Sequence, residues 1–206
     1  FHKAARAAGI KPIVGCELTI AKGWRAPAIW GAAAGLWRLP VLVESQEGYR
    51  NLCRLLTRFK LESPKGEGVL KLEDLDGFTT GLVALVGRAA LLGHRYGVGG
   101  LLDRVIGLFG QSHVYVELQR HLLRDEEIDN QALIALAEAY HVPLVATNGV
   151  RFANVDDRQL YDVQTCLRHK ITLDQAGRRL VCNSERYLKS PAAMAKLFRD
   201  RPEALA

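Results

Sequence analysis

The stretch HVPLVATNGVRF, residues His141–Phe152, joins an apolar run to a polar tail. The run Val142–Val145 is short and rich in β-branched residues, and Pro143 and Gly149 bound it, which is typical of a buried strand. α/β proteins place their chemistry beyond the C-terminal ends of parallel strands. The polar tail TNGVR is therefore where we first expect a functional site.

Strand-like and helical segments alternate along the rest of the chain. Short apolar runs bounded by Gly or Pro predict strands, and apolar residues spaced three to four apart predict helices. This alternation favours a parallel α/β sheet or barrel. The predicted strands are residues 13–20, 39–44, 81–86, 114–118 and 142–147, and the predicted helices are residues 4–8, 48–59, 72–75, 100–109, 125–140 and 156–169, with a last helix that Ser190 caps and Pro191 begins.

Two of the predicted helices are amphipathic enough to indicate which side faces the core. The inward positions expected in residues 48–59 are Tyr49, Leu52, Cys53, Leu56 and Phe59. Those expected in residues 125–140 are Ile128, Ala132, Leu133, Leu136, Ala137 and Tyr140. Residues 21–35 are rich in Gly, Ala and Trp, which indicates an irregular segment, and we expect Trp24, Trp30 and Trp37 to cover the core.

Length and composition fit an ordinary globular chain. The 206 residues are 49% hydrophobic, enough for one large domain or one domain with a piece of another. No apolar run has the roughly 18 residues of a membrane helix, and the first residues lack the apolar core of a signal peptide. The chain opens without Met inside a helical pattern, so we interpret it as a fragment of a longer protein.

Charge and cysteine content limit the possible partners and the compartment. The net charge of +6 suits a polyanionic partner, although simple solubility explains it equally well. The four cysteines form no CxxC pair, which argues against a zinc cluster and against a disulfide framework. We therefore expect a reduced protein in the cytoplasm, with no membrane partner.

Polar residues at or just past several predicted strand ends are the candidates for a site. They are Glu17, the segment from Glu117 to His121, and the segment from Asn148 to Arg151, which would share one rim in a closed parallel barrel. A divalent metal takes four to six donors, and of the six histidines only His121 stands in such a position. His141 and His169 are expected at the surface.

Arg151 opposes metal binding at this rim, because a fixed cation repels a divalent ion a few ångströms away. We expect its guanidinium to fill the place of a metal and to pair with Glu17, or alternatively with Glu117, since a buried unpaired carboxylate is costly. No catalytic residue is assigned, because HxH, HExxH and GxSxG motifs are absent and no Gly-rich stretch has nucleotide-loop spacing.

Basic residues near the end of the chain form a second candidate. They suit the phosphate backbone of a nucleic acid, yet without interleaved aromatic residues they are more typical of a solvated face. These residues are Arg168, Lys170, Arg178 and Arg179.

Six motifs follow one another along the chain: GIKPIVGCELTI, GYRNLCRLLTR, GLVAL, YVELQRH, VPLVATNGVRF and YLKSPAAMAKLFRDRPEAL. In this order they resemble the polymerase-and-histidinol-phosphatase (PHP) domain at the N-terminus of bacterial C-family DNA polymerases, a group that includes the polymerase III alpha subunit and error-prone polymerases. NLCRLLTR followed by SPKGEG looks more like the error-prone branch.

The resemblance implies a distorted (β/α)7 barrel of TIM type, incomplete here because the first strand with its HxH ligands is missing. Residues 1–190 would form the PHP domain and residues 191–206 the start of the connection to the polymerase core. Active members hold a metal cluster that hydrolyses phosphoesters or pyrophosphate. Glu17 and His121 fall on ligand positions, whereas Arg38, Gly149 and Arg151 replace His, Asp and His.

Three lost ligands imply that no metal occupies the site and that the fragment is a structural module. The parent protein would be a DNA-directed DNA polymerase for damage-induced synthesis, and its palm carboxylates, outside this fragment, would bind Mg²⁺. Its partners would be the palm, thumb and fingers of the same chain, DNA and dNTPs. The alternatives are a residual phosphoesterase, 3′–5′ exonuclease or pyrophosphatase, and the PHP domain of the replicative alpha subunit.

Overall fold

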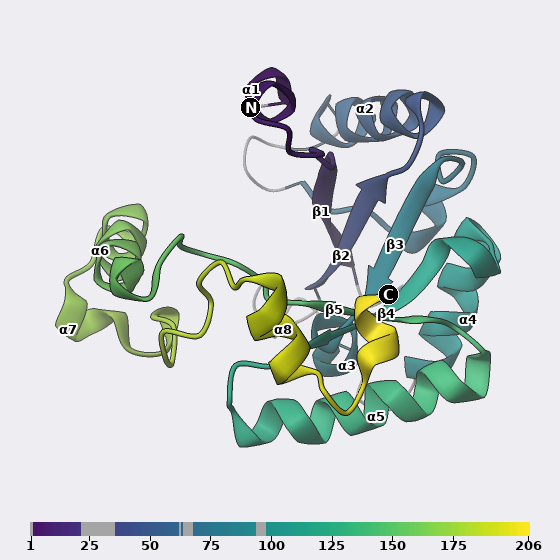
Figure 1. The fold of residues 1–206 in the computed structure, drawn as a ribbon. Helices are drawn as coiled ribbons and strands as arrows, with labels where there is room; N and C mark the ends of the chain where they lie inside the picture. Colours follow the sequence, from purple (N-terminus) through teal and green to yellow (C-terminus); the bar gives the residue numbers. More distant parts are fainter. Residues whose placement is uncertain (1, 22–35, 62, 64–67, 94–97) are drawn as a thin grey trace, which may run out of the picture. The chain divides into compact units, whose positions relative to one another are not determined.

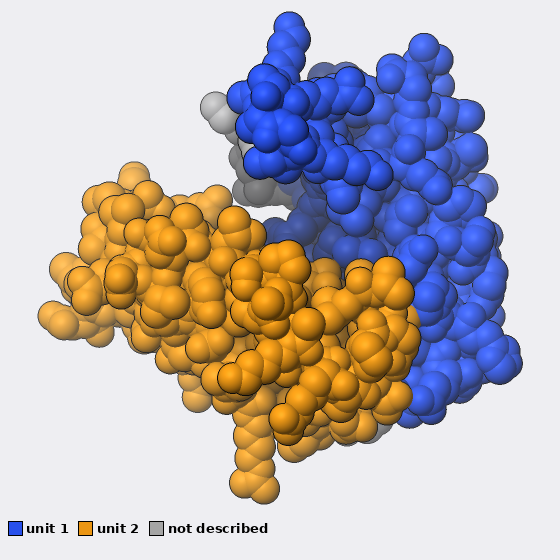
Figure 2. Space-filling model, in the orientation of Figure 1, with its two compact units in different colours: residues 1–116, 133–143 blue, residues 117–132, 144–206 orange. Residues whose placement is uncertain are grey.

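The computed structural model of the chain describes residues 2–21, 36–61, 63, 68–93 and 98–206. Helices and strands alternate along most of this length (Figure 1), and five strands follow chain order, β1 to β5, in one sheet. The α/β class predicted from the sequence is therefore confirmed. The chain divides into two compact units, residues 1–116 with 133–143 and residues 117–132 with 144–206, coloured separately in Figure 2.

Every helix and strand predicted within these residues is present, with ends that differ by a few positions. Unit 1 contains α1 (His2–Ala7), β1 (Gly15–Ala21), β2 (Leu36–Val43), α2 (Gln46–Leu61), η2 (Leu72–Leu75), β3 (Leu82–Val86), α3 (Arg88–Gly93), α4 (Val98–Phe109) and η3 (Gln111–His113). β4 (Val114–Gln119) and α5 (Arg124–Tyr140) run through both units. Unit 2 contains β5 (Leu144–Thr147), η4 (Val155–Asp157), α6 (Arg158–His169), α7 (Leu173–Ala176), η5 (Gly177–Arg179), α8 (Pro191–Leu197) and η6 (Pro202–Leu205).

The sheet is mixed, which corrects the expectation of a parallel one. β1 with β2 and β2 with β3 are antiparallel pairs, and β3 with β4 is a parallel pair. The cause lies in the connection between β2 and β3, which travels the length of the strands twice. After α2 the chain reaches Leu70, which bridges to Ile20, and it then returns so that Leu82 pairs with Val43. Two passes reverse the strand direction that a single crossover helix would have kept.

The core of unit 1 lies on one face of β1 and β2 and under α2. The strands bury alternate residues, including Leu18, Ile20, Trp37, Leu39 and Val41. Trp37 thus covers core as expected, whereas Trp24 and Trp30 lie outside the described residues.

The buried side of α2 differs from the predicted one. It consists of Gly48, Asn51, Leu52, Leu55 and Phe59. The expected inward positions Tyr49 and Cys53 are exposed, so the helix is turned relative to the prediction. This rotation of the helix places Gly48, which has no side chain, where the helix approaches the backbone of another segment.

Gly48 meets Gly81 at a backbone contact that fixes α2 to the start of β3. A Cβ atom on Gly48 would lie 1.8 Å from the carbonyl oxygen of Gly81, and Gly81 has φ +75°, which favours glycine. The side-chain amide of Asn51 donates to the carbonyl of Thr80 at 3.0 Å. The contact is closer than any residue with a side chain would allow.

α5 (Arg124–Tyr140) buries polar residues in its first half, which explains another incorrect expectation. Ile128 was predicted inward but is 64% exposed, whereas Glu126 and Asn130 are both 2% exposed. Leu133 and Ala137, in the second half, are buried as predicted. Hydrophobic periodicity does not detect a side of a helix that is buried through hydrogen bonds.

Unit 2 packs its remaining elements around the end of β4. Leu118 and Phe198 are fully buried, and Ala204 in η6 is 2% exposed, so residues 191–206 are an integral part of this unit. Ser190 caps α8 by accepting from the backbone N–H of Ala193 at 3.2 Å, as predicted. Among the described residues, none of the helices has the length and apolar composition needed to cross a membrane.

β5 (Leu144–Thr147) differs from the buried strand that the sequence predicted. It comes last in the strand order, and each of its residues is half-buried. A strand at the end of a sheet has a neighbour on one side only, which leaves part of its surface open. The polar tail that follows it nevertheless reaches a buried position at Asn148.

We predict that Gly48→Ala destabilises the chain by more than about 2 kcal/mol, because two stretches of backbone must separate to admit the methyl group. Gly107→Ala is the matched control, since no heavy atom lies within 4 Å of its Cβ position in α4 and alanine favours the helix by up to ~1 kcal/mol. Urea unfolding of both variants measures the difference. Equal stabilities for the two variants would contradict the described contact.

Candidate functional site

The candidate site lies in unit 2, where polar residues follow β4 and β5. The segments Glu117–His121 and Asn148–Arg151 were both predicted here, and the structure brings them together by hydrogen bonds. A third segment, residues 183–187, joins them and was not predicted as part of the site. The side-chain amide of Asn183 donates to the carbonyl of His121 at 2.6 Å, and that of Asn148 donates to the carbonyls of Glu185 and Tyr187 at 3.0 and 2.7 Å.

His121 is the centre of this cluster and is 1% exposed. Its Nδ1 lies 2.5 Å from Oε1 of Glu126, and its backbone N–H donates to Oε2 of the same carboxylate at 2.6 Å. Its Nε2 lies 2.9 Å from the backbone carbonyl oxygen of Asn148. One side chain thereby joins the end of β4, the start of α5 and the end of β5.

Both ring nitrogens of His121 face atoms that only accept hydrogen bonds. The carboxylate oxygen lies 2.5 Å from one ring nitrogen and the carbonyl oxygen lies 2.9 Å from the other, so protein atoms engage both nitrogens. Neither nitrogen is left to face a metal ion. His121 therefore holds protein atoms together and is not oriented as a ligand.

Glu126 is the anionic partner of this ring. Burial raises the pKa of its carboxyl, but hydrogen bonds from the ring and the backbone of His121, with the charges of His121 and Arg186, hold the pKa below its ordinary value. The carboxylate is thus kept ionised in a buried place by the groups around it. Sequence reasoning missed Glu126, because it resembles an ordinary acidic residue in the first turn of a helix.

Arg186 provides the cation at this site. Its Nη1 donates to the carbonyl of Gly149 at 3.3 Å, and a Cβ atom on Gly149 would lie 2.6 Å from that nitrogen. Gly149 also has φ +48°, a backbone conformation that favours glycine. The absence of a side chain at position 149 makes room for the guanidinium.

Arg151, expected to fill this role, is exposed, and its backbone N–H donates to the carbonyl of Arg186 at 2.8 Å. Glu117, its proposed alternative partner, instead accepts from the hydroxyl of Thr147 at 2.6 Å and from the amide of Gln119 at 3.1 Å. The sequence carried little signal for Arg186, because the segment SERYLK has no periodicity that orients its side chains.

Glu17 and Arg38 form a separate pair in unit 1. Nη1 of Arg38 lies 3.1 Å from Oε2 of Glu17, with side chains that are 63% and 47% exposed. Glu17 stands within β1 (Gly15–Ala21), where it pairs with Pro40 of antiparallel β2, and not beyond a strand end as expected. Arg38 thus supplies the cation that we had assigned to Arg151. An exposed pair of this kind contributes about 0–1 kcal/mol.

The donor set does not fit a metal centre. Within the described part of the chain, no three His, Cys, Asp or Glu side chains gather as a metal ion requires. His121 uses both ring nitrogens, and Glu17 faces an arginine. The chemistry of the described cluster is that of a satisfied hydrogen-bond network.

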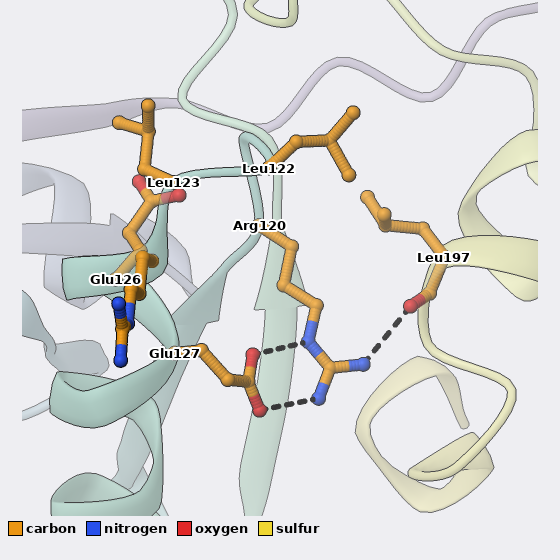
Figure 3. A pocket seen from close by; sticks show the side chains of 7 residues that line it. Arg120, Leu122, Leu123, Glu126, Glu127 and Leu197 are labelled. Carbon is orange, nitrogen blue, oxygen red and sulfur yellow. Dashed lines mark hydrogen bonds and ion pairs between the residues drawn. The ribbon is translucent and has the colours of Figure 1, made fainter.

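Arg120 makes a second set of ion pairs in unit 2, beside a cavity of about 310 Å³ (Figure 3). Its guanidinium donates to Glu127 at 3.2 Å, to Asp200 at 2.5 Å and to the carbonyl of Leu197 at 2.9 Å, and it lies 5.0 Å from the ring centre of Phe198. The hydrogen bond from Arg120 lowers the pKa of Asp200 to about 2. These contacts attach the end of α8 to the start of α5.

The basic residues proposed for nucleic acid are separate from the hydrogen-bond cluster. All are exposed: Arg168 and Lys170 lie at the end of α6 (Arg158–His169), and Arg178 and Arg179 lie in η5 (Gly177–Arg179). Lys170 caps α6 in a left-handed conformation with φ +54°. His141 and His169 are exposed, as predicted.

Comparison with known proteins identifies relatives for the whole chain. The family described as PHP domain matches residues 1–121. The chain is 36% identical to the DNA polymerase III subunit alpha of Pseudomonas aeruginosa over 213 residues, which cover 100% of this chain and 18% of that protein. It is 39% identical to the error-prone DNA polymerase of Rhodopseudomonas palustris over 158 residues, which cover 77% of this chain and 14% of that protein.

A further relative is the error-prone DNA polymerase of Anaeromyxobacter dehalogenans, which is 34% identical over 207 residues, covering 100% of this chain and 17% of that protein. The chain therefore spans less than a fifth of the length of these curated relatives, between 14% and 18%.

We predict that Gly149→Ala destabilises the chain more than Gly177→Ala does. Gly177 has the nearly identical φ of +49° but no atom within 4 Å of its Cβ position, so it is the control for the cost of a positive φ. The loss of unfolding free energy in Gly149→Ala should exceed that in Gly177→Ala by about 1–3 kcal/mol, the cost of displacing Arg186 and Gln119. When Arg186 is replaced by Ala, this excess should shrink. An unchanged excess would show that Arg186 does not occupy the space beside Gly149.

A second prediction concerns acid stability. Because the pKa of Glu126 is lowered in the folded chain, its contribution to stability is complete above pH 4.5 and is lost as the pH falls through the lowered pKa. Glu126→Gln should lower the free energy of unfolding by about 3–5 kcal/mol near neutral pH, since it removes the buried carboxylate that the ring and the backbone N–H of His121 both contact. The stability difference between this variant and the unsubstituted chain should narrow below pH 4.5, as measured by urea unfolding at several pH values. A stability difference independent of pH would contradict an ionised carboxylate at position 126.

Proposed function

The chain belongs to the PHP domain family, and on that premise we propose that it is the N-terminal PHP domain of a bacterial C-family DNA polymerase. The support is that the chain aligns over its full length with polymerases while spanning less than a fifth of them. DNA synthesis would be carried out by palm-domain carboxylates with Mg²⁺, outside these residues. The palm, thumb and fingers of the same protein, with DNA and dNTPs, would be its partners, in the cytoplasm where a bacterial polymerase acts.

We propose further that the domain is a catalytically degenerate structural module. The observation that carries this proposal is His121, whose two ring nitrogens both lie at hydrogen-bonding distance from protein oxygen atoms. Gly149 and Arg151 offer no ligand atoms where active members carry Asp and His, and Arg38 stands where they carry His. Arg186 adds a cation that repels divalent ions. A family barrel of seven strands is part of the same proposal, and so is the assignment of residues 191–206, which pack within unit 2, to the start of the connection to the polymerase core.

We assign the parent polymerase to the error-prone branch, which performs damage-induced synthesis. The motif NLCRLLTR with SPKGEG supports this assignment, as does the 39% identity to the enzyme of Rhodopseudomonas palustris. The replicative alpha subunit is the second candidate, favoured by 36% identity over the full chain to the Pseudomonas aeruginosa protein. Bypass of a template lesion by the purified parent enzyme separates the two.

The rival proposal is a working phosphoesterase, exonuclease or pyrophosphatase that uses Glu17 and His121. We expect Glu17→Ala in the full-length parent protein to leave primer extension unchanged and stability within about 0.5 kcal/mol, because the Glu17–Arg38 pair is exposed. Metal analysis and hydrolysis assays accompany this measurement. Stoichiometric zinc or manganese that disappears with Glu17→Ala, together with hydrolysis, would establish the rival.

DNA contact through the basic residues Arg168, Lys170, Arg178 and Arg179 is a separate prediction. Neutralising these four residues in the parent protein should weaken DNA binding and make its salt dependence shallower, since each phosphate contact releases counterions. Arg50, Arg54, Arg58 and Lys60 in α2 (Gln46–Leu61), an equal number of cations, serve as the matched control set. An unchanged salt slope in the four-residue variant would exclude this surface from DNA binding.

A further inference from the structure

α6 (Arg158–His169) packs on unit 2 by one side only. Cys166 is its single buried residue, and the ring of Tyr161 lies 5.9 Å from that of Phe152. Asp162, on the same side, has a side chain that is 13% exposed and pairs with Arg158. These contacts identify the side of α6 that packs against the rest of unit 2.

The outer side of α6 is apolar at its centre. Leu160, Val163 and Leu167 are 59%, 42% and 72% exposed and follow one another at the spacing i, i+3, i+7, so they form one stripe. Leu173 in the adjoining α7 (Leu173–Ala176) is 51% exposed and adds to the apolar surface of this part of unit 2. Single exposed aliphatic residues need no explanation, but a stripe along the outer side of a helix is typical of an interface.

The size of the stripe favours a partner in the same chain. Three or four aliphatic side chains fall short of the roughly 1,200 Å² that a stable complex between separate proteins buries. A tethered domain is held at a high effective concentration, so a small contact suffices. The curated relatives extend far beyond the aligned residues, and residues 202–205 pack in the unit that carries the stripe, so a continuing chain would leave from unit 2.

We propose that the stripe of Leu160, Val163 and Leu167 is the docking surface for a later domain of the same polymerase chain. This inference rests on the proposed function for the existence of that domain. The matching surface should present aliphatic or aromatic side chains at its centre.

The test places a photo-crosslinking amino acid at position 163 of the full-length protein, with position 169 as the control. His169 is exposed on the other side of the same helix, near its end. We expect position 163 to crosslink to residues beyond 206 of the same chain and position 169 not to do so. Crosslinks from position 163 to a second copy or to another protein, or no crosslink at all, would overturn the proposal.

A second measurement uses Leu160→Ser with Leu167→Ser in the full-length protein, against Gln159→Ser with Gln164→Ser. The apolar pair should lower the first thermal transition by a few degrees and expose α6 to protease, whereas the glutamine pair should leave both unchanged. Equal behaviour of the two variants would overturn the docking surface. Primer extension by the unsubstituted protein is measured in parallel, so that failure of the polymerase assignment is seen separately from failure of the contact.

Discussion

The buried contact between His121 and Glu126 is the interaction on which unit 2 depends most. It engages the backbone N–H and one ring nitrogen of His121 with the two oxygens of the Glu126 carboxylate, while the other ring nitrogen lies against the carbonyl oxygen of Asn148. A buried charge without such partners would be strongly destabilising. Because each group is satisfied only when the ends of β4 and β5 and the start of α5 are in place, the pair makes their arrangement cooperative.

The same requirement gives a histidine at a strand end a structural role. A histidine beside a carboxylate at a strand end can bind a metal through its second nitrogen. Here a backbone carbonyl takes that nitrogen, and Arg186 enters the space that the missing side chain of Gly149 leaves open. The residues at these strand ends are polar, and in this network their donors and acceptors bind one another.

Two further contacts depend on residues that are far apart in the chain. Arg120 meets Asp200, 80 positions later, and thereby holds the end of α8 against the start of α5. In unit 1, Gly48 meets Gly81 with no room for a side chain, which brings α2 against the start of β3. Each contact joins segments that are far apart in the sequence. Hydrophobic periodicity carries no signal for such a contact, although both contacts help to fix how the elements pack.

The sequence by itself determined the α/β class, the helices and strands of the described residues, the polar character of the β4 and β5 ends and the family. These features are local, since periodicity, caps and turn residues act over a few positions. Strand direction, the outward turn of Ile128 and Tyr49, and the cation of the site were decided by tertiary structure alone. The reason is physical: whether Arg38, Arg151 or Arg186 neutralises a given carboxylate depends on which distant segments meet. Arg186 occupies the space beside Gly149 because residues 183–187 are hydrogen-bonded to the strand ends.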